Sequence, residues 1–439
     1  MSRSATRTVE VAPPIERAFL VALESPAAER WPVERRLSEL GGLAVAAGAE
    51  VVGSTSQRRT RPDPAWYLGK GRAADLADEK AMTGFSVLVV DDELSPAQQR
   101  NLETLLDGKV LDRSALILDI FARHARTREG RLQVELAQLE YHLPRLTRLW
   151  THLSRTGGGI GTRGPGESQL ETDRRRIREK IHRLRGEIGA VKRHRATAAR
   201  RRDRSEIPVV ALVGYTNAGK STLLNTLADA DAFVADMPFA TLDPTSRRIS
   251  LDSGRHVVLT DTVGFINKLP HDLIDAFRAT LEEVLRADLL LEVVDASDPD
   301  FIAQQATVGA VLAELGAGDK PRIRVFNKLD RLNGAVERAG PQPSDEDVAY
   351  VSALTGEGLA ALRERIATAL RGPLVDVDAV VPYPRAELVA RARQAGEVTE
   401  RFTDDGVRIA GRLPATLAGE VRAAAIARPR ARRKTPVSG

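Results

Sequence analysis

The first 125 residues alternate short apolar runs with longer stretches in which apolar residues recur every three or four positions. The short runs predict buried strands at 19–23, 50–54, 86–91 and 109–111. The longer stretches predict helices near 28–47, 72–82, 96–106 and 114–124. Regular alternation of strands and helices favours a layered α/β domain over residues 1–125.

A turn at residues 67–71, which contains Lys70 between two glycines, precedes the second of these helices. Because the amides at the start of a helix attract anions, the turn is a candidate site for an anion or a nucleotide. The alternative is an ordinary connecting turn, since the full glycine pattern of a phosphate-binding loop is missing.

Two apolar stripes with spacings of four and three residues follow this domain. The first contains Leu132, Leu136, Leu139, Leu143, Leu146 and Leu149, and the second contains Ile177, Ile181, Leu184, Ile188 and Val191. Matched stripes of this kind predict two helices that pack as an antiparallel hairpin or a short coiled coil over residues 126–204. We expect Pro144 to kink the first helix, because proline lacks the backbone N–H that the helix needs.

The segment between the two stripes has six glycines in the thirteen residues 154–166, and a basic helix follows it. Residues 174–204 contain 14 Lys or Arg and three acidic residues, a net charge of +11 against +5 for the whole chain. Such a block on a mildly acidic body indicates a polyanionic partner, and we expect loop and helix to enter folded RNA together. The loop alone is also compatible with a flexible linker. The predicted RNA contacts are Arg155, Arg163, Arg174, Arg175, Arg176 and Arg178.

Composition restricts the remaining possibilities. The chain has 439 residues, no cysteine and 42 % hydrophobic residues, which suits several ordinary folded domains and excludes disulfides and thiolate metal sites. No stretch approaches the length of an apolar membrane span, and no apolar signal segment follows the first residues. We expect a cytoplasmic, monomeric protein.

A phosphate-binding loop lies between an apolar strand at 207–213 and a helix at 221–230. Its glycines permit a tight turn whose amides surround phosphate oxygens, and the start of the helix adds its positive dipole end. In this P-loop pattern the lysine reaches the β- and γ-phosphates and the serine hydroxyl binds Mg²⁺. The predicted nucleotide contacts here are Gly214, Tyr215, Thr216, Asn217, Ala218, Gly219, Lys220 and Ser221.

Asp261 ends a second apolar run, at 256–260, where a carboxylate is expected to hold the magnesium ion through a water. Gly264 follows three residues later, and its N–H is expected to reach the γ-phosphate. A lone Asp-x-x-Gly is common in loops, but after a P-loop and a strand it indicates the second part of the same site. Thr262 and Val263 complete this segment.

Recognition of the base is expected from a third segment, Asn327, Lys328, Leu329 and Asp330, which follows a strand at 323–326. The carboxylate of Asp330 can accept hydrogen bonds from guanine N1–H and the 2-amino group. Adenine lacks these donors and leaves the carboxylate unpaired, at a cost of about 1 to 3 kcal/mol or more. The site therefore favours GTP over ATP, which disfavours an ATP-dependent motor. Ser352, Ala353 and Leu354 follow the next strand, and the Ala353 N–H is expected to reach guanine O6.

These segments predict a Ras-like P-loop GTPase domain over residues 205–371. Beyond it, apolar patterns predict a strand at 375–381, a helix at 385–394, strands at 398–403 and 407–413, and a helix at 414–427. This order describes a small α+β domain over residues 372–428. Residues 429–439 are basic and are expected to be disordered.

Several longer motifs of the chain resemble those of HflX GTPases. They occupy residues 164–167, 169–171, 239–245, 261–266, 269–271 and 276–283. The resemblance implies a factor that binds the large ribosomal subunit and splits or rescues stalled or idle ribosomes under stress, with its hairpin directed toward the peptidyl transferase region. It also implies ATP binding by the N-terminal domain, for which Lys70 is the candidate here.

The same resemblance implies that Thr241 completes the coordination of magnesium when GTP is bound, and that Phe239, Ala240, Leu242 and Asp243 line the nucleotide site. Thr245 is the competing threonine, and composition does not choose between the two. Lys220, Thr241 and Gly264 are then the residues expected to contribute directly to catalysis.

Two positions predict an unusual hydrolytic mechanism. Phe265 stands where many Ras-like GTPases carry the glutamine that orients the attacking water, so we expect slow intrinsic turnover that the ribosome stimulates. Asn217 resembles the asparagine of GTPases that bind potassium beside the phosphates, although a simple loop-capping role fits it equally. A ribosome-assembly GTPase and a nucleotide-gated RNA-binding regulator remain the alternative functions.

Overall fold

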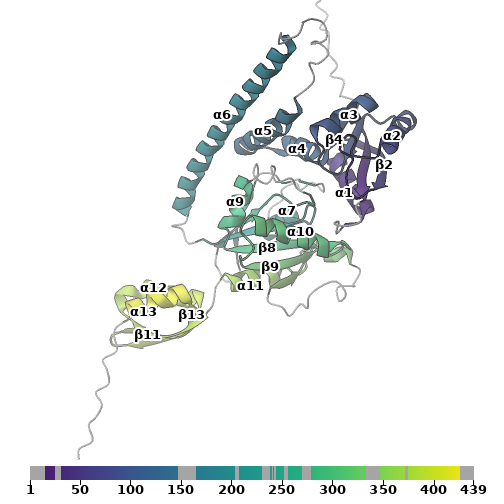
Figure 1. Cartoon of the computed structure of the whole chain (residues 1–439). Coiled ribbons are helices and arrows are strands. Elements are labelled where there is room, and N and C mark those ends of the chain that lie inside the picture. Colours follow the sequence, from purple (N-terminus) through teal and green to yellow (C-terminus); the bar gives the residue numbers. More distant parts are fainter. Residues whose placement is uncertain are drawn as a thin grey trace, which may run out of the picture.

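The computed structural model describes residues 15–24, 31–146, 165–202, 207–229, 238–239, 241, 244–251, 256–268, 278–332, 347–370 and 374–425. Within these residues the chain forms three sheets, of four, six and three strands. Helices pack on each sheet, and a pair of long helices separates the first sheet from the second along the chain (Figure 1). The mixed α/β fold expected from the sequence is confirmed.

The N-terminal domain is built on a parallel sheet with the strand order β2-β1-β3-β4. Its central strand β1 (Arg17–Glu24) is almost fully buried, because helices cover both of its faces. The other strands are β2 (Glu50–Arg58), β3 (Val87–Val90) and β4 (Lys109–Asp112). Helices α1 (Val33–Ala46) and α4 (Arg113–His124) pack on one face, and α2 (Lys70–Thr83) and α3 (Pro96–Leu106) on the other. All eight predicted elements are present, although α1 begins later than expected.

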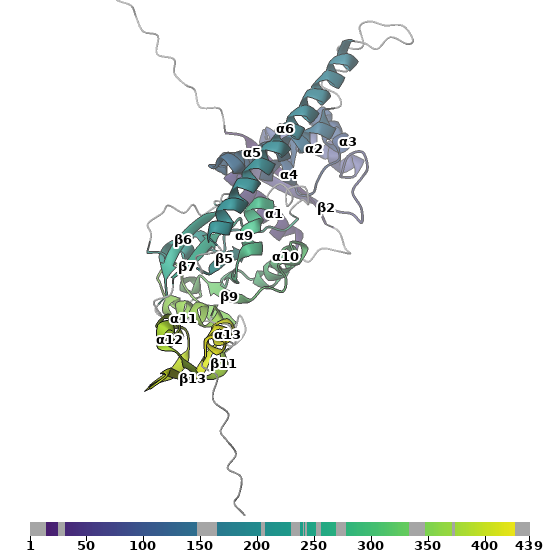
Figure 2. The same ribbon diagram turned by 90° about the vertical axis from the view of Figure 1, so that its left-hand side faces the viewer.

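The two apolar stripes pair as predicted where both are helical, but Leu146 lies beyond the end of α5 and Leu149 lies outside the described residues. Helix α5 (Arg128–His142) packs on α6 (Pro165–Arg202), with Leu136 in one cluster with Ile181, Leu184 and Ile188. The expected kink at Pro144 is wrong: α5 ends at His142, and Pro144 lies in a short 3₁₀ turn, Leu143–Arg145. A proline that cannot donate to the preceding turn here ends the helix. The 38-residue α6 extends past α5 toward the GTPase domain (Figure 2).

The GTPase domain has a six-stranded sheet with the order β10-β9-β8-β5-β7-β6, in which β6 alone is antiparallel to its neighbour. Helices α9 and α10 pack on one face and α7 and α11 on the other. The strands are β5 (Val209–Gly214), β6 (Thr245–Ser250), β7 (His256–Asp261), β8 (Leu289–Asp295), β9 (Arg322–Asn327) and β10 (Val348–Tyr350). The helices are α7 (Lys220–Leu227), α9 (Arg278–Arg286), α10 (Phe301–Glu314), α11 (Leu359–Ala369) and the 3₁₀ turn Leu329–Arg331.

The C-terminal domain has the predicted order of strand, helix, strand, strand, helix. Its antiparallel sheet, β11-β13-β12, carries two helices on one face around an apolar core. The elements are β11 (Leu374–Val381), α12 (Ala386–Ala395), β12 (Glu397–Thr403), β13 (Gly406–Pro414), α13 (Ala415–Ala424) and the 3₁₀ turn Tyr383–Arg385. The predicted disorder of 429–439 falls outside the described residues.

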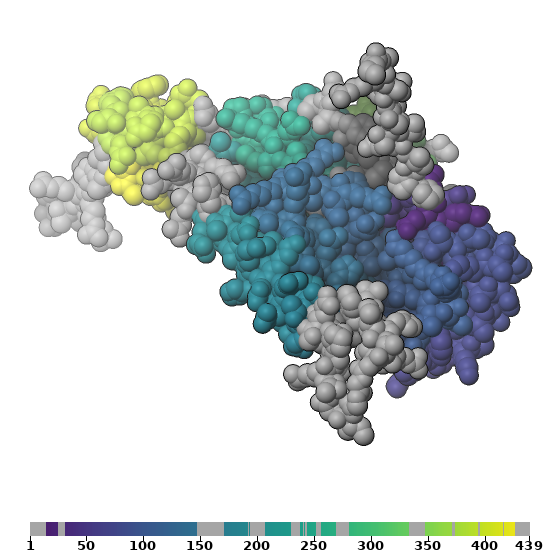
Figure 3. Space-filling model, turned by 90° about the horizontal axis from the view of Figure 1, so that it is seen from above, coloured from purple at the N-terminus to yellow at the C-terminus, as the bar shows by residue number. Residues whose placement is uncertain are grey.

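Viewed from above, the N-terminal domain lies at one end of the molecule and the C-terminal domain at the other (Figure 3). The N-terminal and GTPase domains share one apolar core. In this core, Phe121 of α4 packs edge to face on Phe239, with 4.6 Å between the ring centres. Trp31 stacks on Tyr215, with 5.8 Å between the ring centres. Within the described part of the chain, no helix has the length and apolarity needed to span a membrane.

Candidate GTP-binding and hydrolysis site

The four predicted nucleotide segments meet at one edge of the GTPase sheet. They follow or end β5, β7, β9 and β10, which are parallel, so their carboxyl ends lie at the same edge. Ligands of open α/β sheets bind at this edge. The parallel topology thus brings together segments that are separated by up to 140 residues in the chain.

The P-loop needs glycine at both of its ends. A Cβ on Gly214 would lie 2.3 Å from the carbonyl oxygen of Val293 on β8. A Cβ on Gly219 would lie 2.3 Å from the side-chain nitrogen of Asn327, and Gly219 has a φ of 92°. Asn217 has a φ of 60°, which asparagine tolerates better than most residues. These contacts fix the loop between two neighbouring strands.

Lys220 is the buried cation of the site. Its Nζ donates to the carbonyl oxygens of Tyr215 at 2.7 Å and Gly214 at 3.2 Å. Burial lowers the pKa of Lys220 to about 8, Asp261 opposes this shift, and Lys328 adds to it. A buried ammonium group that is satisfied by carbonyls rather than by a bonded carboxylate suits an anionic ligand such as a phosphate.

Three oxygen-bearing side chains converge beside the P-loop. Asp261 Oδ2 accepts hydrogen bonds from Ser221 Oγ at 2.6 Å and Thr241 Oγ1 at 2.9 Å, and the two hydroxyl oxygens are 2.7 Å apart. Among the described residues, Asp261 Oδ1 is buried without a hydrogen-bond partner. Burial raises the pKa of this carboxyl group. Hydroxyl and carboxylate oxygens are the ligands that Mg²⁺ prefers, so the residues present fit this ion.

The structure separates the two candidate threonines. Thr241 lies within this oxygen cluster, whereas Thr245 begins β6 and is exposed. Phe239 is buried against the N-terminal domain. The predicted contacts Ala240, Leu242 and Asp243 lie outside the described residues.

Asn327 joins two parts of the site. Its Nδ2 donates to the carbonyl oxygen of Ala218 at 2.9 Å, and its Oδ1 accepts the Ala353 N–H at 2.9 Å. The Ala353 N–H thus has an acceptor within the protein, and its contact with guanine O6 stays a prediction. Asp330 is exposed and accepts a 2.5 Å hydrogen bond from Ser352 Oγ, which orients the carboxylate. Leu354 is 77 % exposed.

The residue after Gly264 has no polar role. The Phe265 side chain is fully buried in the core shared with the N-terminal domain. Its backbone forms two hydrogen bonds with the P-loop. The Phe265 N–H donates to the carbonyl oxygen of Gly214 at 3.0 Å, and the Thr216 N–H donates to the carbonyl oxygen of Phe265 at 2.8 Å. A side chain directed into the core cannot orient a water at the phosphates.

The sequence of this chain is similar to known families of GTP-binding proteins. Four family models match, described as GTP-binding GTPase N-terminal at residues 34–122, GTP-binding GTPase Middle Region at 124–202, 50S ribosome-binding GTPase at 209–328 and HflX C-terminal domain at 336–430. The GTPase HflX of Caldanaerobacter subterraneus subsp. tengcongensis is 48 % identical over 401 residues, which are 91 % of each chain. The chain belongs to the HflX family. It is a GTPase that hydrolyses GTP to GDP and phosphate.

A second HflX relative agrees with this assignment, and the chain is also similar to one solved structure. The GTPase HflX of Escherichia coli K12 is 43 % identical over 381 residues, 86 % of this chain and 89 % of that protein. A GTP-binding protein from Sulfolobus solfataricus, solved in complex with GDP, is 25 % identical with a TM-score of 0.43 and covers 81 % of this chain and 98 % of its own. The family models and the HflX relatives confirm the recognition made from the motifs.

Sequence reasoning missed the part of the site that comes from the N-terminal domain of this HflX chain. The Tyr215 hydroxyl donates to Glu39 of α1 and accepts the Asn267 N–H at 2.8 Å. Lys268 pairs with Asp91 and Asp92 after β3. No motif spacing marks the contacts between the two domains, because their partners are separated by more than 170 residues.

The predicted anion site at residues 67–71 is tied to the N-terminal sheet. The Gly69 N–H donates to Gln57 Oε1 at 2.7 Å, and Tyr67 is buried with its hydroxyl donating to Asp92 at 2.5 Å. These contacts hold the connecting turn in place, and the Gly69 amide already has an acceptor within the protein.

The predicted RNA contacts divide between described and undescribed residues. Arg175, Arg176 and Arg178 are exposed on α6, Arg174 is half-buried, and Arg155 and Arg163 lie outside the described residues. Weak ion pairs, such as Arg175 with Glu179 at 3.8 Å, leave most of this charge facing solvent.

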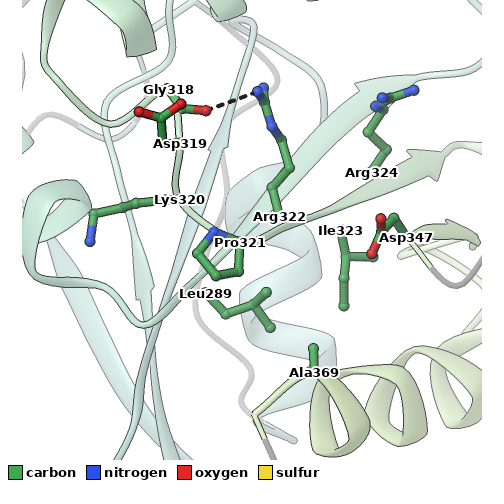
Figure 4. Close-up of a pocket in the computed structure, with 10 residues that line it drawn as sticks. All are labelled: Leu289, Gly318, Asp319, Lys320, Pro321, Arg322, Ile323, Arg324, Asp347 and Ala369. Atoms are coloured by element: carbon green, nitrogen blue, oxygen red, sulfur yellow. Dashed lines mark hydrogen bonds between the residues drawn. The ribbon is translucent and has the colours of Figure 1, made fainter. Parts of the chain in front are cut away.

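A pocket of about 350 Å³ lies at the opposite end of the GTPase sheet (Figure 4). It is lined by Leu289 and Arg322, the first residues of β8 and β9, together with Lys320 and Asp347. Because the nucleotide segments follow the other ends of these strands, this pocket is not part of the GTP site.

Proposed function

We propose that this HflX-family GTPase binds the large ribosomal subunit and splits or rescues stalled or idle ribosomes under stress, with the GTP or GDP state controlling its affinity. The observation that carries the proposal is the 38-residue basic helix α6, which packs on α5. Exposed arginines on a rigid helix suit the phosphates of ribosomal RNA. One matching family model is itself described as a 50S ribosome-binding GTPase.

The proposed hydrolysis is attack of water on the γ-phosphate of GTP. Lys220 and the P-loop amides would neutralise charge that develops on the phosphate oxygens, and Gly264 would donate its N–H to the γ-phosphate. Ser221 and Thr241 would hold Mg²⁺ directly, and Asp261 through a water. When bound, this ion neutralises phosphate charge and orients the phosphates for in-line attack.

Intrinsic turnover is proposed to be slow and to rise on the ribosome, because Phe265 offers no hydrogen bond to the attacking water. Asn217, exposed at the turn of the P-loop, is a candidate ligand for K⁺ beside the phosphates. Turnover that is equal in potassium and sodium buffers would remove K⁺ from the mechanism.

ATP binding near Lys70 of the N-terminal domain stays a prediction. Loss of ATP affinity in K70A is the test.

The deciding experiment is cosedimentation with separated ribosomal subunits, in GTP, in GDP and in a non-hydrolysable GTP analogue. We expect binding to the large subunit with GTP or the analogue and weaker binding with GDP. Splitting of mature ribosomes, followed by light scattering, should proceed with the analogue. Splitting that requires hydrolysis would contradict nucleotide-state control in this form.

A charge-removal variant tests the RNA-binding helix. Changing Arg175, Arg176 and Arg178 to Gln should weaken large-subunit binding about tenfold or more and flatten its salt dependence. The matched control removes three exposed arginines of the C-terminal domain, Arg401, Arg412 and Arg422. An equal loss of binding in both variants would show only a general attraction between positive charge and RNA.

Two other outcomes would favour the alternative functions. Activity on immature particles alone would favour an assembly GTPase, and tight binding to free structured RNA would favour an RNA-binding regulator.

A further inference from the structure

A closed ring of contacts joins the P-loop to the segment that is expected to read guanine. Asn327 Nδ2 donates to the carbonyl oxygen of Ala218 in the P-loop, and Asn327 Oδ1 accepts the Ala353 N–H, both at 2.9 Å. The carbonyl oxygen of Ala353 in turn accepts a hydrogen bond from Thr226 Oγ1 at 2.8 Å. Thr226 lies on α7, which follows the P-loop directly, so the helix closes the ring. Thr226 itself belongs to none of the nucleotide motifs.

The Thr226 hydroxyl lies between two acceptors. It is 2.9 Å from the carbonyl oxygen of Thr222, one turn earlier in α7, and 2.8 Å from that of Ala353. A hydroxyl has a single proton to donate, so the two carbonyls share it. The Thr222 carbonyl also has the helical N–H four residues later as a donor. Ala353 is only 4 % exposed, and a buried carbonyl without a donor costs free energy comparable to a lost hydrogen bond. The bond therefore matters more to Ala353 than to the helix.

This bond sets the direction of the peptide group between Ala353 and Leu354. The peptide group is planar and trans, so the Ala353 C=O and the Leu354 N–H point in opposite directions. With its oxygen on Thr226, the carbonyl is directed at α7. A rotated peptide group would instead place this acceptor toward guanine O6, which is also an acceptor.

The rest of the loop is closed on itself. The Ser352 N–H donates to the carbonyl oxygen of Glu357 at 3.0 Å, and the Gly356 N–H donates to that of Ser352 at 2.9 Å. These bonds fix the shape of the loop. Thr226 and Asn327 contact it from α7 and from the end of β9, so they fix its place on the domain.

We propose that Thr226 is a positioning residue for guanine recognition: its hydroxyl holds the Ala353 carbonyl against α7 and keeps the N–H groups of residues 353–354 available to guanine O6. The proposal rests on the proposed contact between this segment and O6. It concerns affinity for the base and not the chemistry at the γ-phosphate.

The first test compares T226V with T226S and T307V. T226V keeps the branched shape and removes the hydroxyl, so the Kd for GDP and the KM for GTP should rise about threefold to tenfold, the effect of one neutral hydrogen bond. The kcat should stay within about twofold, because the reacting phosphate is not touched. T226S retains the hydroxyl and should bind like the wild type.

Thr307 supplies the matched control, since its hydroxyl makes the same bond within α10, to the carbonyl oxygen of Ala303 at 3.0 Å. T307V should leave Kd, KM and kcat unchanged. Unchanged affinity in a T226V protein that retains its thermal unfolding midpoint would overturn the proposal, as would equal losses in T226V and T307V.

The second test separates positioning from a general loosening of the site. In 6-thio-GTP a sulfur atom, which is a weaker acceptor, replaces O6, and both donors expected to pair with Asp330 remain. T226V should weaken GTP more than 6-thio-GTP, so the preference of the wild type for GTP should shrink about threefold or more. Equal losses for both nucleotides would overturn the role of Thr226 while the GTP site itself stands. A wild-type protein without this preference would overturn the contact with O6, and the proposal with it.

Discussion

Lys328 Nζ lies 2.7 Å from Asp295 Oδ2, and both side chains are largely buried at the edge of the sheet that carries the nucleotide segments. Asp295 is itself oriented, because its other oxygen accepts the N–H and the hydroxyl of Ser297. Lys328 has a φ of 67° and follows Asn327 in the segment predicted to recognise the base. The ion pair thus fixes a lysine stem beside the place expected for guanine.

Neutralising this acid should weaken nucleotide binding. In D295N the Lys328 ammonium group loses its charged partner, and its stem is no longer held beside the place expected for guanine, so we expect the affinity for GDP and GTP to fall about tenfold. Fluorescent-nucleotide titration measures this change. D319N, which alters an exposed acid at the far pocket, should bind like the wild type. Equal affinity in D295N and wild type would contradict the role of the pair.

Base selectivity should depend on Asp330. In D330N an amide replaces the carboxylate, so the two guanine donors lose their charged acceptor and GTP affinity should fall about 100-fold. Xanthine presents a carbonyl where guanine has its amino group, so binding of xanthosine triphosphate should improve. Competition titrations with both nucleotides measure the switch. Retained preference for guanine would show that other groups read the base.

The oxygen cluster predicts different effects for the two threonines. T241A removes a hydroxyl that lies on Asp261, so magnesium-dependent binding of GTP should weaken about tenfold while GDP binding changes little. T245A removes an exposed hydroxyl at the start of β6 and should leave both affinities unchanged. Titrations with and without magnesium make the comparison. A larger effect in T245A would reverse the assignment.

A buried acid on β8 predicts a dependence of stability on pH. Burial raises the pKa of Glu292. The charges of Arg322, 3.7 Å away, and of Arg324 oppose this increase only in part. A raised carboxyl pKa means that the folded state binds more protons than the unfolded state, so this group destabilises the fold as pH rises. E292Q should therefore raise the unfolding midpoint at pH 8 and less so at pH 5.

The exposed acid Glu397 on β12 provides the control, since E397Q should leave the midpoint unchanged at both pH values. A lower midpoint for E292Q than for the wild type at pH 8 would mean that attraction to Arg322 outweighs the cost of burial. Thermal unfolding followed by circular dichroism gives all of these midpoints.

The sequence by itself determined the local elements and the nucleotide motifs. Gly214, Gly219 and Lys220 have meaning at fixed spacings within one strand–loop–helix unit, and the stripes of Leu136 and Ile181 follow the helical period. These spacings and periodicities involve residues that are close in the sequence, so they can be recognised without knowledge of the tertiary structure. They were sufficient to predict the architecture, the family and the GTPase reaction.

Only the tertiary structure decided how these parts act on one another. The Asn327 side chain joins the P-loop to Ala353, Thr241 rather than Thr245 lies on Asp261, and Phe265 points into a core shared by two domains. Lys268 meets Asp91 across 177 residues of chain. The physical reason is that these pairs depend on the order of strands and on domain packing, and no periodicity or local spacing records which distant residues the fold brings into contact.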